Sequence, residues 1–254
     1  MKNPALGSSV HYPAATDRPV ALVTGSVGRL GQALCRRLAG EGYRLVLHAR
    51  RREPGLQKLG RELESMGAEA RLAPFDLAQT SRVGAWGLQV GAAWGRLDLL
   101  VNGASEFHPT PGGGTPGAWE RMTRVNAMAP YFLSRALGPL LANHRGSIVN
   151  LVDTYADHPI LPDHPAYLAS KAALAALTRV LALELAPKVR VNGVSPGVIT
   201  FPKSYSKTRR KALAQKSLLQ RAGSPEDIAE AVLYLARASF TTAEILRVDG
   251  GRFI

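Results

Sequence analysis

Tyr167 and Lys171 are spaced as a catalytic pair would be. They lie four residues apart near the start of a long apolar-periodic segment, and residues with this spacing project from the same face of a helix. An ammonium beside a phenol stabilises the phenolate, so Lys171 would lower the pKa of Tyr167 from about 10. Such a Tyr can give a proton to a carbonyl or imine while a hydride arrives from the other side. The same spacing also occurs by chance on many helices, so the pair needs support from the rest of the chain.

A glycine-rich turn follows the first apolar run of the chain. Val20 to Val23 is typical of a strand, and Thr24-Gly25-Ser26-Val27-Gly28-Arg29-Leu30-Gly31 leads into a helical pattern through Leu38. Strand, glycine-rich turn and helix are the context in which a phosphate meets backbone N–H groups at a helix N-terminus. The spacing is not GxGxxG, so a plain tight turn stays open as the alternative.

The second expected strand ends in basic residues. Arg44 to His48 is followed by Ala49-Arg50-Arg51, and no acidic residue appears before Glu53. At this distance after the glycines an acid would bind a free ribose 2′-hydroxyl, whereas an Arg accommodates a 2′-phosphate. The pattern favours NADP(H) over NAD(H), with an exposed basic loop as the alternative.

Strand-like and helix-like segments alternate along the remaining chain. Further strands are expected at 70–75, 97–101, 147–152, 189–194 and 244–248, and helices at 56–66, 81–94, 119–141, 167–185 and 225–236. Such alternation implies parallel strands with helices on both faces, joined by right-handed crossovers. The sequence therefore predicts an α/β fold, a single Rossmann-like doubly wound domain at 19–254 with a mainly parallel seven-stranded sheet. Residues 1–18 are expected to be a disordered tail, and the polar, basic segment 200–217 a mobile flap.

The composition is that of an ordinary globular chain, with 254 residues of which 46% are hydrophobic and 20% charged. The net charge of +13 would attract anions, but no basic run with interleaved aromatics indicates nucleic acid. Cys35 is the only cysteine, which excludes an intramolecular disulfide and fits a reducing compartment. Without a signal core or an apolar run judged long enough to span a bilayer, a cytoplasmic location is expected. Neither a nucleic-acid partner, a membrane nor a metal site is expected.

From residue 19 onward the chain resembles the short-chain dehydrogenase/reductase family. The matching motifs are Thr24-Gly25 with Gly31, Asp76, Asn102-Gly103-Ala104, Asn126, Tyr167 with Lys171, Pro196-Gly197 and Val248-Asp249-Gly250-Gly251. The resemblance implies that Tyr167 donates the proton and that Lys171 binds the nicotinamide ribose. Asn126 would hold a water leading to Lys171 through a local break in its helix. The other NADP(H) contacts would come from Gly25, Arg29, Leu30, His48, Ala49, Arg50, Arg51, Asp76 at the adenine, Leu77, Asn102, Ala104, Pro196 and Gly197.

Two departures from the common family pattern are similar to the pteridine reductase branch. Arg29 stands where the common turn has Gly, and Asp153 stands where the common catalytic set has Ser. The segments 104–111 and 126–133 are also similar to that branch. The joint occurrence of these features favours a pterin over a simple ketone as substrate.

The resemblance to this branch assigns roles to the substrate site. Phe107 would stack the pterin against the nicotinamide, while Ser105 and Arg29 would contact the pterin and the cofactor phosphate. Asp153 would act with Tyr167 in proton delivery. Each residue also has a plainer interpretation: Asp153 as a cap of the following turn, Phe107 as loop packing and Arg29 as a partner of a surface acid.

The leading hypothesis is NADPH-dependent reduction of a dihydropterin to a tetrahydropterin, and also of the oxidised pterin or dihydrofolate. One alternative is a ketoreductase acting on an acyl, sugar or steroid carbonyl, where an ionised Asp153 would repel the developing oxyanion. The other is a non-catalytic nucleotide-binding protein, against which the intact Tyr167, Lys171 and Asn126 argue. The resemblance also implies a homotetramer with the last helices and the C-terminal strand at an interface.

Overall fold

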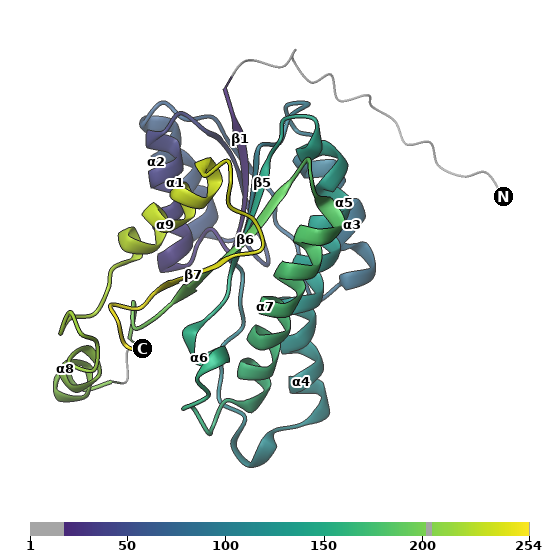
Figure 1. The fold of residues 1–254 in the computed structure, drawn as a ribbon. Helices are drawn as coiled ribbons and strands as arrows, with labels where there is room; N and C mark the ends of the chain where they lie inside the picture. Colours follow the sequence, from purple (N-terminus) through teal and green to yellow (C-terminus); the bar gives the residue numbers. More distant parts are fainter. Residues whose placement is uncertain (1–17, 202–204, 254) are drawn as a thin grey trace.

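Seven parallel strands form the centre of the computed structural model, which describes residues 18–201 and 205–253 (Figure 1). The strands are β1 (Val20–Thr24), β2 (Arg44–Leu47), β3 (Ala70–Leu72), β4 (Leu99–Asn102), β5 (Ser147–Leu151), β6 (Arg190–Pro196) and β7 (Ile245–Val248). Their order in the sheet is β3-β2-β1-β4-β5-β6-β7, and every neighbouring pair is parallel. The predicted doubly wound fold is confirmed, whereas the predicted tail lies, apart from Arg18, outside the described residues.

Helices cover both faces of this sheet. One layer contains α1 (Arg29–Gly40), α2 (Pro54–Ser65) and α9 (Pro225–Arg237), and the other α3 (Thr80–Gly91), α5 (Ala129–Ala142) and α7 (Pro165–Leu185) (Figure 1). The shorter helical segments are η1 (Pro111–Gly113), α4 (Pro116–Thr123), η2 (Arg124–Met128), α6 (Thr154–Asp157) and α8 (Lys207–Ala214). Several of the candidate site residues considered below follow the ends of strands at one edge of the sheet, which we call the carboxyl edge.

The central strand β1 shows why the fold needs both layers. Its side chains alternate between faces, so Ala21 and Val23 join the apolar core under α1, α2 and α9. Val20 and Leu22 join the core under α3, α5 and α7. All four side chains are fully buried, as expected for a parallel strand covered on both faces.

The structure differs from the sequence-based expectation in two helical regions. The helix expected at 119–141 is divided into α4, a π-helical turn at η2, and α5. The flap expected at 200–217 contains the helix α8, in which the Ser206 hydroxyl caps the first turn by accepting from the Arg209 N–H. Residues 202–204 of that segment lie outside the described residues.

The helix α7 corrects the expectation that no apolar run is long enough to span a bilayer. By length and composition alone it could cross a membrane, with 21 residues and a mean hydropathy of 1.4 over its best window. Half of that window is buried inside the fold, where Leu181 and Ala182 belong to the core of the second layer. A helix buried in a protein core passes the same test as a membrane span, and burial accounts for the apolar residues on the inner face of α7.

Candidate active site

Three ionisable side chains meet at the carboxyl edge. Asp153 follows the end of β5, and Tyr167 and Lys171 lie one turn apart in α7. The Tyr167 hydroxyl donates to Oδ2 of Asp153 at 2.5 Å. Nζ of Lys171 donates to the Leu151 carbonyl at 2.7 Å and lies 5.9 Å from the centroid of the Tyr167 ring. We call Asp153, Tyr167 and Lys171 the catalytic cluster.

Asp153 combines a structural contact with a contact to the catalytic Tyr. Its Oδ1 accepts a hydrogen bond from the Tyr155 N–H at 2.8 Å and so caps α6, as an N-terminal Asp commonly does. Its Oδ2 is the acceptor of the Tyr167 hydroxyl. The helix cap therefore fixes the carboxylate in the orientation that the Tyr167 contact requires.

Burial controls the protonation of the catalytic cluster. Burial raises the pKa of Asp153, against the opposing effects of its bonds to Tyr167 and Tyr155 and of the Lys171 charge. Burial lowers the pKa of Lys171 to about 8, with Asp153 opposing. Burial and then the Asp153 carboxylate raise the pKa of Tyr167 well above its usual value. The expected lowering of the Tyr167 pKa by Lys171 is therefore wrong in this arrangement, because burial and then the negative charge of Asp153 both raise that pKa.

The arrangement keeps a proton between two buried oxygen atoms. A phenol with a raised pKa retains its proton, and a carboxylate 2.5 Å away accepts a hydrogen bond from it. A substrate atom that becomes basic beside the Tyr167 hydroxyl can take this proton. The cluster can thus act as a general acid.

Asn126 lies at the predicted break in the helix, within the π-helical turn η2. Its Oδ1 accepts from the Glu106 N–H at 2.8 Å, and its Nδ2 donates to the Glu106 carbonyl at 3.0 Å and to the Ser170 hydroxyl at 3.0 Å. Pro130 has no N–H to donate to the Asn126 carbonyl four residues earlier, which interrupts the regular helical bonding. An Asn followed four residues later by Pro was thus an overlooked sequence signal for this break.

Phe107 lies beside the catalytic Tyr, as the predicted stacking role requires. Its ring meets Tyr167 edge-on, with centroids 4.7 Å apart at 86°, and half of the side chain is exposed. His164 stacks on Phe107 at 4.6 Å and 14°. The Thr110 N–H also donates to the Asp163 carbonyl at 2.7 Å, so the loop after β4 and the loop before α7 touch at two points. Sequence reasoning missed His164, whose contact with Phe107 leaves no spacing signal.

A cavity of about 420 Å³ opens beside the glycine-rich turn, and we call it the cofactor cavity. Its lining includes the predicted cofactor and substrate residues Gly25, His48, Ala49, Arg50, Arg51, Asp76, Leu77, Ala104 and Ser105. It also includes residues that sequence reasoning did not assign: Val27, Gly28, Glu53, Phe75, Gly103, Glu106, Arg121 and Val125.

The glycine-rich turn is packed closely against the end of β4. Gly25 has φ +74°, and a Cβ there would lie 2.8 Å from the Cα of Ala104. A Cβ on Gly31 would collide with the Gly25 carbonyl oxygen. The Thr24 hydroxyl accepts from the N–H groups of Gly103 and Ala104 at 3.0 and 3.2 Å. The turn at the cavity wall therefore requires both glycines, and its backbone is fixed by β4.

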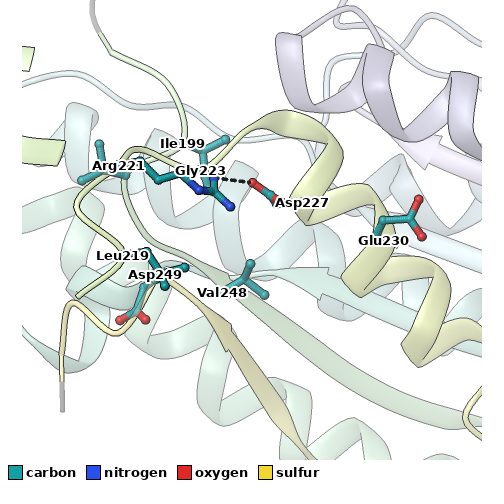
Figure 2. A pocket seen from close by; sticks show the side chains of 10 residues that line it. Ile199, Leu219, Arg221, Gly223, Asp227, Glu230, Val248 and Asp249 are labelled. Atoms are coloured by element: carbon teal, nitrogen blue, oxygen red, sulfur yellow. Dashed lines mark hydrogen bonds and ion pairs between the residues drawn. The ribbon is translucent and has the colours of Figure 1, made fainter. Parts of the chain in front are cut away.

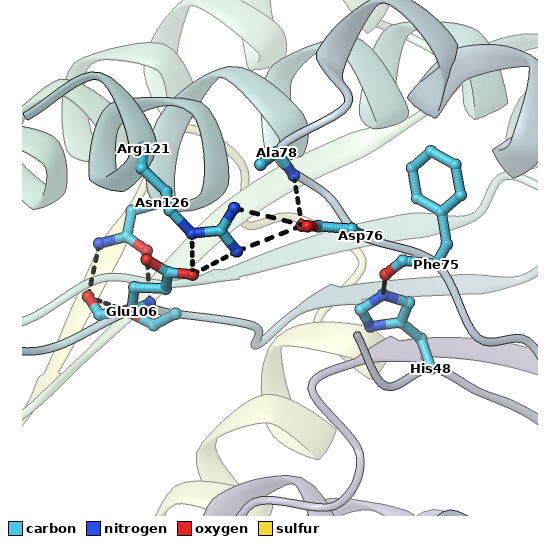
Figure 3. Close-up of polar contacts among 8 residues, drawn as sticks. His48, Phe75, Asp76, Ala78, Glu106, Arg121 and Asn126 are labelled. Carbon is cyan, nitrogen blue, oxygen red and sulfur yellow. Dashed lines mark hydrogen bonds and ion pairs between the residues drawn. The ribbon is translucent and has the colours of Figure 1, made fainter. Parts of the chain in front are cut away.

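His48 lines the cofactor cavity with a side chain that is bonded inside the fold. The side chain is only 2% exposed; Nδ1 accepts from the Gly25 N–H at 3.1 Å, and Nε2 lies 2.8 Å from the Phe75 carbonyl (Figure 3). Burial lowers its pKa to about 4, so His48 is neutral and supports the glycine turn from inside. Any positive charge at this part of the cavity comes from Arg50 and Arg51, both exposed.

Arg121 joins two acidic residues across the cofactor cavity (Figure 3). Its Nε donates to Oε1 of Glu106 at 2.8 Å, and its terminal nitrogens lie 3.4 Å from the carboxylate oxygens of Asp76. Burial opposes ionisation of Asp76, yet the Ala78 N–H and Arg121 together lower its pKa. Arg121 is 45 residues from Asp76 in the sequence, and no motif pointed to this contact.

Other predicted cofactor residues lie outside the cavity lining. The Arg29 guanidinium donates to the carbonyl of Phe201, a residue that follows β6, at 3.1 Å. Leu30 is the next residue of α1. The Pro196 carbonyl accepts from the Thr154 hydroxyl at 3.0 Å. Pro196 thus ends β6 beside the residue that follows Asp153. Gly197 continues the pairing with β7, since its N–H donates to Val248 at 2.9 Å.

Asn102 differs from its predicted role at the cofactor. The side chain is buried inside the fold, where Nδ2 donates to Oδ1 of Asn150 at 2.8 Å and to the Ser134 hydroxyl at 3.2 Å. Asn150 in turn donates to the Thr178 hydroxyl at 2.9 Å. Asn102 therefore joins β4 to β5 and α5 beneath the site, while Gly103 and the residues after it line the cavity.

A smaller cavity of about 220 Å³ lies near the start of α9 and the end of β7 (Figure 2). Arg221 and Asp227 form an ion pair of 3.4 Å in its wall, and its lining contains none of the predicted site residues. Within 18–201 and 205–253 there is also no group of three or more His, Cys, Asp or Glu that could hold a metal ion.

Comparison with known proteins places the chain in a family. The family model described as "Enoyl-(Acyl carrier protein) reductase" matches residues 27–252. The "Granaticin polyketide synthase putative ketoacyl reductase 2" of Streptomyces violaceoruber is 35% identical over 246 residues, 93% of this chain and 97% of the relative. Pteridine reductase 1 of Leishmania tarentolae is 34% identical over 277 residues, 92% of this chain and 96% of the relative.

A solved structure supports the same assignment. The structure of a blue fluorescent protein from a metagenomic library in complex with NADPH matches with a TM-score of 0.85 and 31% identity, covering 93% of this chain and 98% of that chain. The similar relatives include "Dehydrogenase/reductase SDR family member 4" of Sus scrofa, which is 30% identical over 92% of this chain and 87% of the relative. Together with the sheet order and the Tyr167–Lys171 pair, these matches show that the chain is an oxidoreductase-type member of the short-chain dehydrogenase/reductase family.

Proposed function

We propose that this protein is an NADPH-dependent pteridine reductase that reduces a C=N bond of a dihydropterin. The observation that carries the proposal is the 2.5 Å hydrogen bond from the Tyr167 hydroxyl to Asp153, in a buried cluster next to the Phe107 ring. Reduction of C=N places a hydride on carbon and a proton on nitrogen. Tyr167 delivers the proton, and the Asp153 carboxylate orients its hydroxyl. The oxidised pterin and dihydrofolate are further candidate substrates.

The cofactor cavity supports NADPH as the source of the hydride. Its glycine turn lies in the cavity wall directly before the N-terminus of α1, where phosphates bind favourably. Asp76 accepts donors at the end expected for adenine, and the exposed Arg50 and Arg51 suit a ribose 2′-phosphate. Bound NADPH would supply the hydride, and the family resemblance supports Lys171 as the residue that would hold the nicotinamide ribose.

The chemistry of the catalytic cluster suits a pterin. A pterin is a flat heteroaromatic ring system with an amidine-like edge, which stacks on an aromatic side chain and bonds to a carboxylate. Phe107 supplies the half-exposed ring and Asp153 the carboxylate. The 34% identity to pteridine reductase 1 of Leishmania tarentolae adds support.

A ketoreductase is the second candidate, favoured by the 35% identity to the ketoacyl reductase relative of Streptomyces violaceoruber. A reduced carbonyl develops negative charge on oxygen, and a buried carboxylate beside Tyr167 would oppose that charge. Asp153 therefore separates the two candidates.

A substrate panel with purified protein tests the proposal. NADPH consumption is measured with dihydrobiopterin and with an acetoacetyl thioester, for the wild type and for Asp153→Ser. We expect the wild type to reduce the pterin with the higher kcat/KM, and Asp153→Ser to lose pterin reduction by about tenfold or more. Faster reduction of the thioester by the wild type would assign the protein to the ketoreductases.

The homotetramer and the cytoplasmic location remain predictions. Tyr234 on α9 and Phe240 beyond its end expose large apolar side chains near β7, where the family resemblance places an interface. A single tetrameric mass in solution, measured by light scattering, would support that assembly.

A further inference from the structure

The segment between β6 and α9 carries positive charge alone. From residue 199 to residue 225 the sequence contains seven Lys and Arg residues and no Asp or Glu, in a chain with 19 acidic residues. Four of these cations follow one another closely in α8, as Lys207, Arg209, Arg210 and Lys211. The side chains of Lys207, Arg209 and Lys211 are exposed. Part of the positive net charge of the chain is therefore concentrated on the helix α8.

This charge pattern is unfavourable for the helix that carries it. A helix N-terminus favours negative side chains, yet the first turn of α8 contains Lys207 and Arg209 and no acid. Lys207 and Lys211 stand four residues apart, where like charges repel. Natural proteins break such local rules mainly at functional sites. An external anion would offset both unfavourable effects.

The helix α8 is connected to the catalytic cluster through the C-terminal residues. Arg252 donates from Nη1 to the Leu213 carbonyl of α8 at 3.0 Å, and its guanidinium lies 5.8 Å from the centroid of the Tyr155 ring. The Tyr155 N–H is bonded to Asp153. Figure 1 shows α8 on the same side of the molecule as α6, beyond the end of β6. The cations of α8 thus lie on the side of the molecule that carries α6, joined to it through Arg252, and outside the catalytic cluster.

Arg209 is the cation of α8 with the most defined position. Its guanidinium carbon lies 3.8 Å from the centroid of the Tyr205 ring, which orders the planar group while leaving the side chain exposed. Tyr205 thereby holds Arg209 in one orientation near the start of α8. An ordered guanidinium is suited to phosphate or carboxylate.

We infer that α8 recognises an anionic side chain on the substrate, so that the preferred substrate is a dihydropterin extended by a phosphate or carboxylate group. The inference rests on the proposed function and specifies its substrate class. The ring would bind at Phe107 and the catalytic cluster, and the anionic extension would leave the site toward Lys207, Arg209 and Lys211. Arg221 does not belong to this recognition surface, because it is paired with Asp227.

The experiment compares substrates that differ in one anionic group. Dihydroneopterin and dihydroneopterin monophosphate share the ring and the side chain, and dihydrofolate supplies the carboxylate arm. With saturating NADPH, kcat/KM is measured for the wild type and for the triple variant Lys207→Gln, Arg209→Gln, Lys211→Gln. We expect the wild type to prefer the phosphate ester, and the triple variant to lower the ratio of ester to neutral pterin by about tenfold, since exposed charge pairs contribute modestly. Added salt should lower the wild-type ratio and have little effect on that of the variant.

A matched variant and separate outcomes keep the inference testable. Arg61→Gln, Arg82→Gln, Lys188→Gln removes the same charge from exposed positions on other elements, and its ratio should equal that of the wild type. An equal ratio in the wild type and the α8 variant would overturn the inference, as would an equal loss in the matched variant.

A larger response to dihydrofolate than to the phosphate ester would assign the surface to carboxylates. If the α8 variant lost turnover only of a ketone linked to an acidic carrier protein, the surface would serve a protein and the inference would be wrong. Turnover of neutral dihydroneopterin tests the proposed pteridine reductase activity itself. If the wild type does not turn it over, both the proposed function and the role of α8 are wrong. If the wild type turns it over but does not prefer the phosphate ester, only the role of α8 is wrong.

Discussion

Around the glycine-rich turn, which we call the cofactor half of the carboxyl edge, Thr24 and His48 are bonded to the backbone. In the catalytic cluster, which we call the catalytic half, three ionisable side chains come together. His48 is neutral and holds the Gly25 N–H and faces the Phe75 carbonyl. Asp153, Tyr167 and Lys171 instead all have pKa values displaced by burial. One half is a frame held by hydrogen bonds to the backbone, and the other contains ionisable groups whose charged forms are disfavoured by burial.

This difference separates binding from chemistry. Perturbed pKa values concentrate where proton transfer occurs, and the catalytic cluster fits that description. The cofactor half needs a fixed shape and a surface charge, which glycines, Thr24 and the exposed Arg50 and Arg51 provide. Changes in the catalytic half should therefore alter kcat, and changes in the cofactor half should alter cofactor affinity.

The largest expected effect comes from Tyr167→Phe. Removing the hydroxyl eliminates the proton donor and leaves Asp153 without its 2.5 Å partner, so kcat should fall by about 10²–10⁴. The dissociation constant of NADPH, measured by fluorescence titration, should change little. Tyr131→Phe is the matched control, because that hydroxyl bonds to Glu184 on the outer surface of α5 and α7. Comparable turnover in both variants would mean that Tyr167 is not the proton donor.

The second effect is a pH dependence confined to the catalytic half. The pKa of Lys171 is lowered to about 8, so its ammonium is present below that pH and lost above it. We expect kcat/KM to fall by up to about tenfold per pH unit above pH about 8. The pKa of His48 is about 4, so NADPH affinity should not respond to His48 between these two values. A rate that stays constant well above the Lys171 pKa would contradict the assigned role of the ammonium.

The smallest effect should come from the rim of the cofactor cavity. Arg50→Ala and Arg51→Ala each remove an exposed cation, and each should raise the KM for NADPH by about tenfold, the scale of one charge-assisted bond. The KM for NADH, which lacks the 2′-phosphate, should hardly change. Arg52→Ala is the control, since Arg52 is exposed but lies outside the cavity lining. Equal losses for both cofactors would argue against the preference for NADPH.

The fold was accessible from sequence because its signals are local. Apolar runs such as Val20 to Val23, and the glycines of the following turn, indicate strand and turn without knowledge of distant residues. The Tyr167–Lys171 pair follows from helix geometry in the same way. The resemblance to a known family then identified Asp153 as a candidate site residue, and in the structure Asp153 is in contact with Tyr167.

The remaining parts of the site depend on contacts between distant residues. Arg121 contacts Asp76 and Glu106 from the helix α4, and His164 contacts Phe107 from a different loop. Neither contact follows from the spacing of residues along the sequence. The direction of the Tyr167 pKa was wrong because it depends on burial and on which charge touches the phenol, and neither is visible in a helical repeat. His48 was assigned to the cofactor from its place after the second strand, and the burial that keeps it neutral could not be known from that place.

The stacking of Phe107 on His164, together with the bond from Thr110 to Asp163, has a consequence for protein engineering. The two loops that carry these residues belong to different crossovers of the sheet, yet they behave as one exchangeable module. A graft that imports the loop after β4 from a relative would leave its aromatic ring without a matching platform. Altering the substrate range of this scaffold therefore calls for transplanting both loops together.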